Sequence, residues 1–108
     1  MNNVQLEGRL TTDPDIRYTE AGYCIGKFTL AVKRFYDVKK PDAQEADFIP
    51  CVAFGKTAED IGNNVAKGQR LLIHRGTLAT SKYKDKEGNN RNYMAVHVFG
   101  FSYIEKKS

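Results

Sequence analysis

Aromatic and basic side chains lie next to one another in four short segments of this sequence. The segments are Arg34-Phe35-Tyr36, Phe54-Gly55-Lys56, Lys82-Tyr83-Lys84 and Arg91-Asn92-Tyr93. An aromatic ring can stack on the face of any nucleobase, while Lys and Arg bind the phosphates that join successive bases. The pattern therefore indicates a surface suited to an unpaired nucleic-acid strand, bound without reading its sequence.

Some of these rings could instead belong to the hydrophobic core. Phe48 and Phe54 lie in an apolar segment, and phenylalanines in strands usually pack inside. Spacing alone leaves the core and stacking interpretations equally weighted for these two residues. Tyr83 favours stacking, because polar residues flank it on both sides and offer little core to join.

Motifs for catalysis or metal binding are weak. Gly55-Lys56-Thr57 resembles the end of a phosphate-binding P-loop, but Pro50 stands where that motif needs its first glycine. His74 and His97 are not spaced as metal ligands, and we expect them to be strand residues with structural partners. The sequence therefore predicts a binding protein that is not an enzyme and uses no metal or cofactor.

Composition sets broad limits on the protein class. The 108 residues suit one domain with a modest core. Seventeen Lys and Arg against thirteen Asp and Glu give a net charge of +4, which weakly favours a polyanionic partner. Cys24 and Cys51 lack C-x-x-C spacing and are expected to be buried free thiols. A leader peptide, a membrane-length apolar run and a glycosylation motif are all missing, so we expect a cytoplasmic protein without membrane contact.

Periodicity predicts a mostly β domain. Alternating apolar residues predict five strands, at residues 4–10, 28–36, 47–54, 71–78 and 93–104. Pro50 is expected at an edge-facing position or a bulge. Helical spacing occurs once, with Thr57 as the expected N-cap, Ile61 and Val65 on the apolar side, and a stop at Lys67-Gly68. A polar hairpin is expected around residues 85–89.

The order of these elements predicts the fold class. Three strands, one short helix and two further strands suit an all-β OB-fold, a five-stranded Greek-key barrel with the helix between strands 3 and 4. We expect one binding domain over residues 1–104 and a short C-terminal end over 105–108.

Many short motifs, in consistent order, resemble those of bacterial single-stranded-DNA-binding proteins. The opening motifs are Asn3-Val4, Gly8-Arg9-Leu10, Asp13-Pro14 and Arg17-Tyr18. Later matches are residues 28–32, Asp47-Phe48-Ile49, Phe54-Gly55-Lys56 with Ala58-Glu59, Lys67-Gly68, Gly76-x-Leu78 and the hairpin at 83–91. The similarity covers nearly the whole chain. It implies an OB-fold homotetramer that binds single-stranded DNA without sequence specificity during replication, recombination and repair.

The resemblance also implies roles for particular residues. Tyr36, Phe48, Phe54 and Tyr83 fall where the family places stacking aromatics, several of which are tryptophan in many members. This chain has no tryptophan, so we expect weaker stacking. With the neighbouring basic residues, the predicted DNA-binding set is Arg17, Lys33, Arg34, Tyr36, Phe48, Phe54, Lys56, Lys82, Tyr83, Lys84 and Arg91.

Partners and rival functions remain open at this point. Family members typically continue into a disordered tail with an acidic tip that recruits other proteins. This chain stops at Ser108, so recruitment by that route is in doubt. One rival is an OB-fold adaptor of the primosome type, which acts through protein contacts and often as a dimer. Another is an RNA-binding OB or cold-shock module, although its dense aromatic motifs are not found here.

Overall fold

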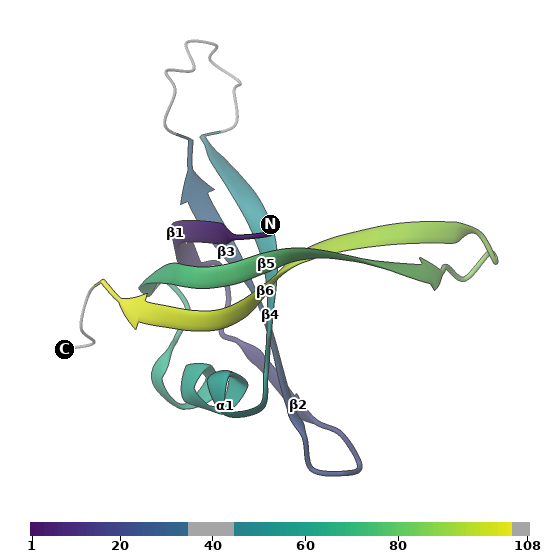
Figure 1. The fold of residues 1–108 in the computed structure, drawn as a ribbon, viewed down its shortest axis with the longest axis horizontal. Helices are drawn as coiled ribbons and strands as arrows, with labels where there is room; N and C mark the ends of the chain where they lie inside the picture. The colour runs from purple at the N-terminus through teal and green to yellow at the C-terminus, as the bar shows by residue number, and fades with distance from the viewer. Residues whose placement is uncertain (35–44, 105–108) are drawn as a thin grey trace.

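The computed structural model describes residues 1–34 and 45–104. Its elements are β1 (Val4–Leu10), β2 (Asp15–Tyr18), β3 (Cys24–Lys33), β4 (Ala46–Phe54), α1 (Gly55–Asn64), β5 (Arg70–Lys84) and β6 (Asn90–Tyr103). Figure 1 shows a central barrel from which the β5–β6 hairpin extends as a long arm. Residues 35–36 of the expected second strand, and Tyr36 with them, lie outside the described residues.

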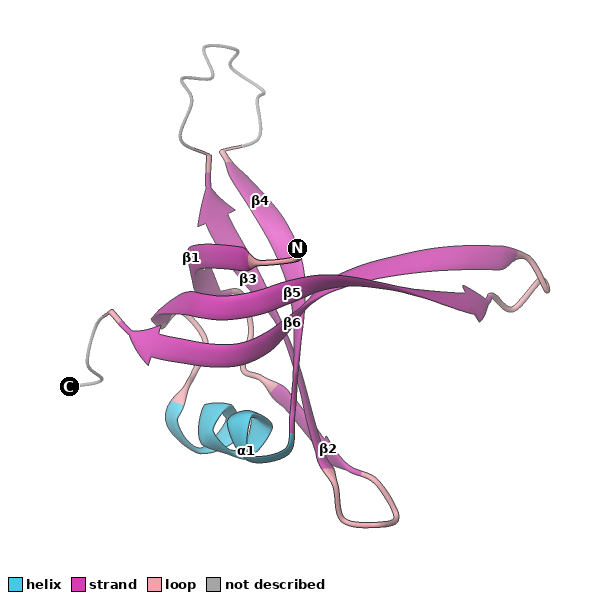
Figure 2. Ribbon diagram, viewed as in Figure 1, coloured by secondary structure: helices cyan, strands magenta, loops and turns pink. Residues whose placement is uncertain are grey.

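Strand β1 closes the barrel because it pairs on both sides. The sheet order is β1-β5-β6-β4-β3-β2, and β1 additionally pairs with β3. Five strands, β1, β5, β6, β4 and β3, therefore form a closed ring, while β2 continues along β3 below β1 (Figure 2). Pairing is antiparallel except between β4 and β6. The predicted OB-fold with one short helix is confirmed.

Close approach of β1 to β3 depends on a glycine. Arg9 and Leu10 pair with Ala31 and Leu30. A Cβ atom at Gly8 would lie only 2.6 Å from the carbonyl oxygen of Ala31. A residue without a side chain is therefore required where the ring closes.

Alternate residues of each strand point into the barrel. Leu30, Leu71 and Ile73 are fully buried there, as the period of two in a strand requires. Helix α1 packs against one end of the barrel through Ala58 and Ile61 (Figure 2).

Both thiols are buried and free, as expected. Desolvation by burial raises the pKa of Cys51 to about 12. Cys51 is therefore protonated at neutral pH and behaves as a small apolar core residue.

The helix begins earlier than the sequence predicts. It starts at Gly55, with Phe54 as the N-cap and no capping side chain, so the assignment of Thr57 as the N-cap is wrong. Gly55 has φ of +62° and turns the chain directly from β4 into α1, which leaves Thr57 inside the first turn. At the other end Val65 is the C-cap, so it packs in the core from just beyond the helix.

Strand boundaries also differ from the expectation. Strand β2 was not predicted, because a four-residue strand with Ile16 as its one half-buried residue has little periodicity. Strand β3 begins at Cys24 instead of 28, since the inward Gly26 interrupts the apolar alternation. Pro50 lies where β4 is paired with β3 alone, because pairing with β6 covers residues 51–53; its edge-facing position is as expected.

We expect Gly8→Ala to destabilise the fold by about 1–3 kcal/mol, because the new methyl group would overpack the β1–β3 contact. Urea unfolding followed by far-UV circular dichroism measures this. Glu7→Ala is the matched control in the same strand, since Glu7 is exposed and its 3.8 Å ion pair with Arg70 is worth about 0–1 kcal/mol. Equal stability of the Gly8→Ala variant and the wild type would contradict the proposed closure constraint.

Candidate nucleic-acid interface

Four strands present one continuous outward side, which we call the outer face. Directly paired residues project to the same side of a sheet, and the register runs unbroken from β3 through β4 and β6 to β5 over this region. Phe28, Cys51 and Val96 point into the core, so residues one position away point outward. The outer face includes Lys27, Lys33, Phe48, Phe54, Tyr83, Arg91, Tyr93 and His97.

Phe48 and Phe54 lie on the outer face and not in the core cluster. Phe48 is 59% exposed, and Phe54 is half-buried against the rings of Tyr23 and His97. The core interpretation of these two phenylalanines is therefore wrong. Beneath them, Val52 and Ala95 are buried without belonging to the core cluster, which gives the outer face a firm apolar base.

The β5–β6 arm carries a second aromatic group. Tyr83 is 52% exposed and pairs with Arg91, while Tyr93 is 43% exposed and lies diagonally from Tyr83 on the same side. Arg91 is therefore next to both exposed tyrosines: it is paired with Tyr83 across the ladder and stands two residues before Tyr93 on the same side of β6. Lys82 and Lys84 project from the opposite side of the arm, because side chains alternate along β5.

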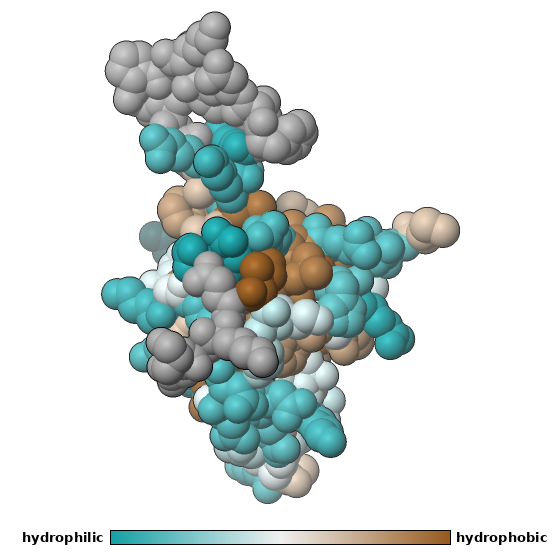
Figure 3. All heavy atoms as spheres, turned by 90° about the vertical axis from the view of Figure 1, so that its left-hand side faces the viewer, coloured by the Kyte–Doolittle hydropathy of each residue, from teal (hydrophilic) through white to brown (hydrophobic). Residues whose placement is uncertain are grey.

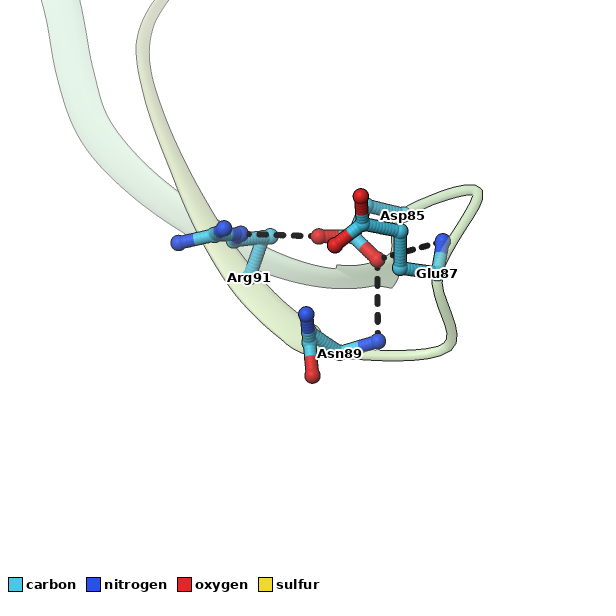
Figure 4. A network of polar contacts seen from close by, with 4 residues as sticks. All are labelled: Asp85, Glu87, Asn89 and Arg91. Atoms are coloured by element: carbon cyan, nitrogen blue, oxygen red, sulfur yellow. Dashed lines mark hydrogen bonds and ion pairs between the residues drawn. The ribbon is translucent and has the colours of Figure 1, made fainter.

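The arm ends in a turn organised by Asp85 (Figure 4). One carboxylate oxygen accepts hydrogen bonds from the backbone N–H groups of Glu87 and Asn89, at 3.0 and 2.9 Å. The other lies 3.0 Å from Nε of Arg91. The Asn89 N–H, followed by the Arg91 guanidinium, lowers the pKa of Asp85 because both favour the charged form. This network also orients Arg91 toward the turn.

The remaining predicted basic residues are dispersed. Arg17 extends the outer face onto β2, where it pairs with Ile25 in register. It lies 3.3 Å from the carboxylate of Asp15. Arg34 follows β3 and lies 2.8 Å from Asp47. Lys56 is exposed at the start of α1, and Lys33 is exposed at the end of β3.

Sequence reasoning missed four outer-face residues. Tyr23 was overlooked because the strand it precedes was expected to start at residue 28. Lys27 stands in the same overlooked segment. His97 was interpreted only as a strand residue with a structural partner. Its ring does contact Phe54, with ring centroids 5.3 Å apart, and it also lies on the outer face. Tyr93 was visible in the Arg91-Asn92-Tyr93 segment, and the register now places it beside Tyr83.

The outer face is suited to binding a ligand. Exposed rings separated by cationic side chains can stack bases and hold phosphates. Within residues 1–34 and 45–104, His, Cys, Asp and Glu form no group of three or more that could hold a metal ion. No helix in this described portion has the length and apolarity to cross a membrane. A closed five-stranded barrel with such a face is an OB-fold of the oligonucleotide-binding kind.

Comparison with known proteins agrees with this class. The model of the single-strand binding protein family matches residues 1–102, and the chain belongs to that family. It is 42% identical over 106 residues to the single-stranded DNA-binding protein of Clostridium perfringens, covering 97% of this chain and 67% of that protein. It is 46% identical over 108 residues to single-stranded DNA-binding protein 2 of Listeria innocua, covering 100% and 67%.

A third relative is considerably longer. The single-stranded DNA-binding protein of Enterococcus faecalis is 41% identical over 108 residues, which cover 100% of this chain and 56% of that protein. The chain therefore spans about two thirds or less of the length of these curated relatives. The similarity extends over 97–100% of this chain.

We expect Asp85→Ala to loosen the arm's turn, because two backbone N–H groups and Arg91 lose their acceptor. Hydrogen exchange of the Glu87 and Asn89 amides should become several-fold faster, whereas Lys86→Ala, a change in the same turn, should leave it unchanged. The pKa of Asp85 is below its usual 3.8 in the folded state. The carboxylate therefore stabilises the turn above the unfolded-state pKa, and this effect is lost as pH falls through the lower folded pKa. Unchanged exchange in Asp85→Ala would contradict this role.

Proposed function

We propose that this chain binds single-stranded DNA without sequence preference and protects it during replication, recombination and repair. The observation that carries the proposal is the outer face, where Phe48 and Tyr83 expose aromatic rings on the same side of one paired sheet. Lys33 and Arg91 stand on the same face as phosphate ligands. The printed names of the relatives, all single-stranded DNA-binding proteins, support the same substrate.

The geometry favours an unpaired strand over a duplex. Rings standing on a sheet surface reach the flat face of a base only when that base is not stacked between its neighbours. In a duplex both faces of each interior base are covered, so the rings have nothing to stack on. The lysines and arginines would bind the phosphates of either form, which makes the rings the source of discrimination.

We further propose that residues 1–104 act as one DNA-binding domain, with 105–108 as a short end, and that the protein works in the cytoplasm on nucleoid DNA. The family match over residues 1–102 supports the domain limits. The protein's role in this proposal is binding without catalysis.

Phe48→Ala should weaken DNA binding by about 1–3 kcal/mol with little change in salt dependence, because a stacked ring releases no counterions. Lys33→Ala should weaken it modestly and lower the magnitude of the slope of log K against log salt by roughly 0.7, if it contacts one phosphate. Anisotropy titration of labelled oligodeoxythymidine at several salt concentrations measures both. Lys67→Ala, in the loop after α1 and off the outer face, is the control for lost charge.

Folding measurements separate stacking from packing in these variants. A buried core phenylalanine changed to alanine costs about 3–5 kcal/mol of stability, whereas exposed Phe48 should cost much less. If Phe48→Ala unfolds the protein but the folded fraction binds normally, the stacking role is wrong. Equal affinity of the wild type for duplex and single-stranded DNA would contradict the proposed function itself.

We also propose that the chain assembles as a homotetramer. The family match covers the whole barrel, and the edge of β1 away from β5 pairs with β3 only at Arg9 and Leu10, which leaves the earlier part of that edge available to another copy. Leu72, Tyr103 and Ile104 are 37–42% exposed. Figure 3, a view of the side on which β6 ends, shows apolar surface bordered by hydrophilic side chains.

Native mass spectrometry of the purified chain tests this assembly. We expect four copies, as the resemblance to the family implies, and association would cover both the apolar surface and the unpaired strand edge. A stable monomer would contradict the proposal. A dimer that binds DNA weakly would favour the primosome-type adaptor instead.

A further inference from the structure

Three aromatic rings form a row at one end of the outer face. Tyr23 and Phe54 are nearly parallel, with 16° between ring planes and 6.3 Å between centroids. Phe54 in turn meets His97 in an edge arrangement, with centroids 5.3 Å apart and 65° between planes. Both distances are typical of interacting aromatic pairs. We call these residues the three-ring row; they come from the β2–β3 turn, β4 and β6.

The β2–β3 turn holds Tyr23 in a defined position. Its backbone N–H donates to Oγ1 of Thr19 at 3.1 Å, and its carbonyl accepts from the Thr19 N–H at 2.9 Å. Gly22 closes the turn with φ of +84°. On the other side, the ring of Tyr23 lies over Gly55, where a Cβ atom would be 3.5 Å from Cε1 of the tyrosine. Tyr23 is nevertheless 52% exposed, so part of the ring is available to a ligand.

Basic groups surround the three-ring row. Arg17, Ile25 and Phe54 occupy one register row across β2, β3 and β4. Lys27 lies in the adjacent register row, diagonal to Phe54. Lys56 is exposed two residues after Phe54. Asp15 of β2 pairs with Lys27 and carries a carboxylate on the same side of the sheet. That carboxylate lies 3.3 Å from Arg17. An exposed ring with several cations around it matches a nucleobase and its flanking phosphates.

We propose that Tyr23 forms a base-stacking subsite with Phe54, as an extension of the proposed DNA-binding function on which this inference rests. Phe48 is six residues from Phe54 along β4, or roughly 20 Å, so the two rings cannot stack on the same base. The Tyr23 subsite therefore engages a separate nucleotide of the same strand, at the end of the outer face remote from Phe48. The DNA path extends onto the β2–β3 turn.

Two variants of Tyr23 test the subsite. Tyr23→Leu keeps apolar contact with Phe54 but removes the ring, and should raise Kd for labelled oligodeoxythymidine roughly 5- to 150-fold. Tyr23→Phe keeps the ring and should bind with wild-type affinity. Tyr18→Leu is the matched control, because Tyr18 is 61% exposed in the same hairpin but pairs with Cys24, on the inward-facing register; its Kd should not change.

A second measurement reports contact with the base directly. The chain has six tyrosines and no tryptophan, so tyrosine provides its intrinsic emission. Saturating oligodeoxythymidine should quench Tyr23→Phe less than the wild type, because one stacked emitter is missing, although both proteins bind equally well. If Tyr23 is merely structural and its emission is not quenched by DNA, its removal would raise the fractional quenching, which would contradict the subsite.

The outcomes separate this inference from the proposed function. If Tyr23→Leu binds like the wild type while Phe48→Ala binds weakly, the subsite is overturned and the proposed function stands. If the wild type itself does not bind the oligonucleotide, both are overturned. If Tyr23→Leu changes the mass of the native assembly, Tyr23 belongs to a contact between copies of the chain, and the subsite is again overturned.

Discussion

Closure of the sheet by β1 is the constraint on which the other features depend. Because β1 pairs with both β5 and β3, the sheet has an enclosed side that is filled by the core and an outer side that is not. Closure requires two backbones to approach at Gly8, where the Ala31 carbonyl leaves no room for a side chain. Once the ring is closed, every strand residue is assigned by register to the core or to the outside. The proposed binding surface consists of the strand residues that point outward.

The long hairpins then extend this surface beyond the barrel. Strands β5 and β6 stay in register from Gly76 and Val98 to the last pair, Lys84 with Asn90, so the alternation set in the barrel continues along the arm. Asn2 fixes the base of the arm, because its side-chain amide both donates to and accepts from the backbone of Leu78, at 2.7 and 2.8 Å. Asp85 fixes the tip. The backbone that carries the arm's rings is therefore tied by hydrogen bonds at both its base and its tip.

Sequence alone could predict the strands with strong alternation, the single helix and the OB-fold. It could not place Phe48 and Phe54, because an apolar segment with both parities occupied allows either side to face inward; the pairing of Phe28 with Cys51 decides that question. It also missed Tyr23, whose aromatic contact joins two elements about thirty residues apart. Such contacts depend on tertiary register, and spacing along the chain carries no information about them. The helix start at Gly55 was missed for a local reason, since a positive φ replaces the usual capping side chain.

The charges of the interface divide into two kinds, with different consequences for binding. Three of the predicted DNA-binding arginines already lie within 3.3 Å of an aspartate; the pairs are Arg17 with Asp15, Arg34 with Asp47, and Arg91 with Asp85. Lys27 and Lys33 have no ion pair with any described residue. A phosphate that reaches one of these arginines must compete with a carboxylate, although an exposed pair of this kind is worth only about 0–1 kcal/mol. Each phosphate that a protein cation neutralises releases counterions condensed on the DNA. An arginine already paired with a carboxylate neutralises a phosphate less fully, so the lysines should dominate the salt dependence of the proposed complex. Besides contacting phosphates, the paired arginines help to hold the hairpins and the rings beside them in position.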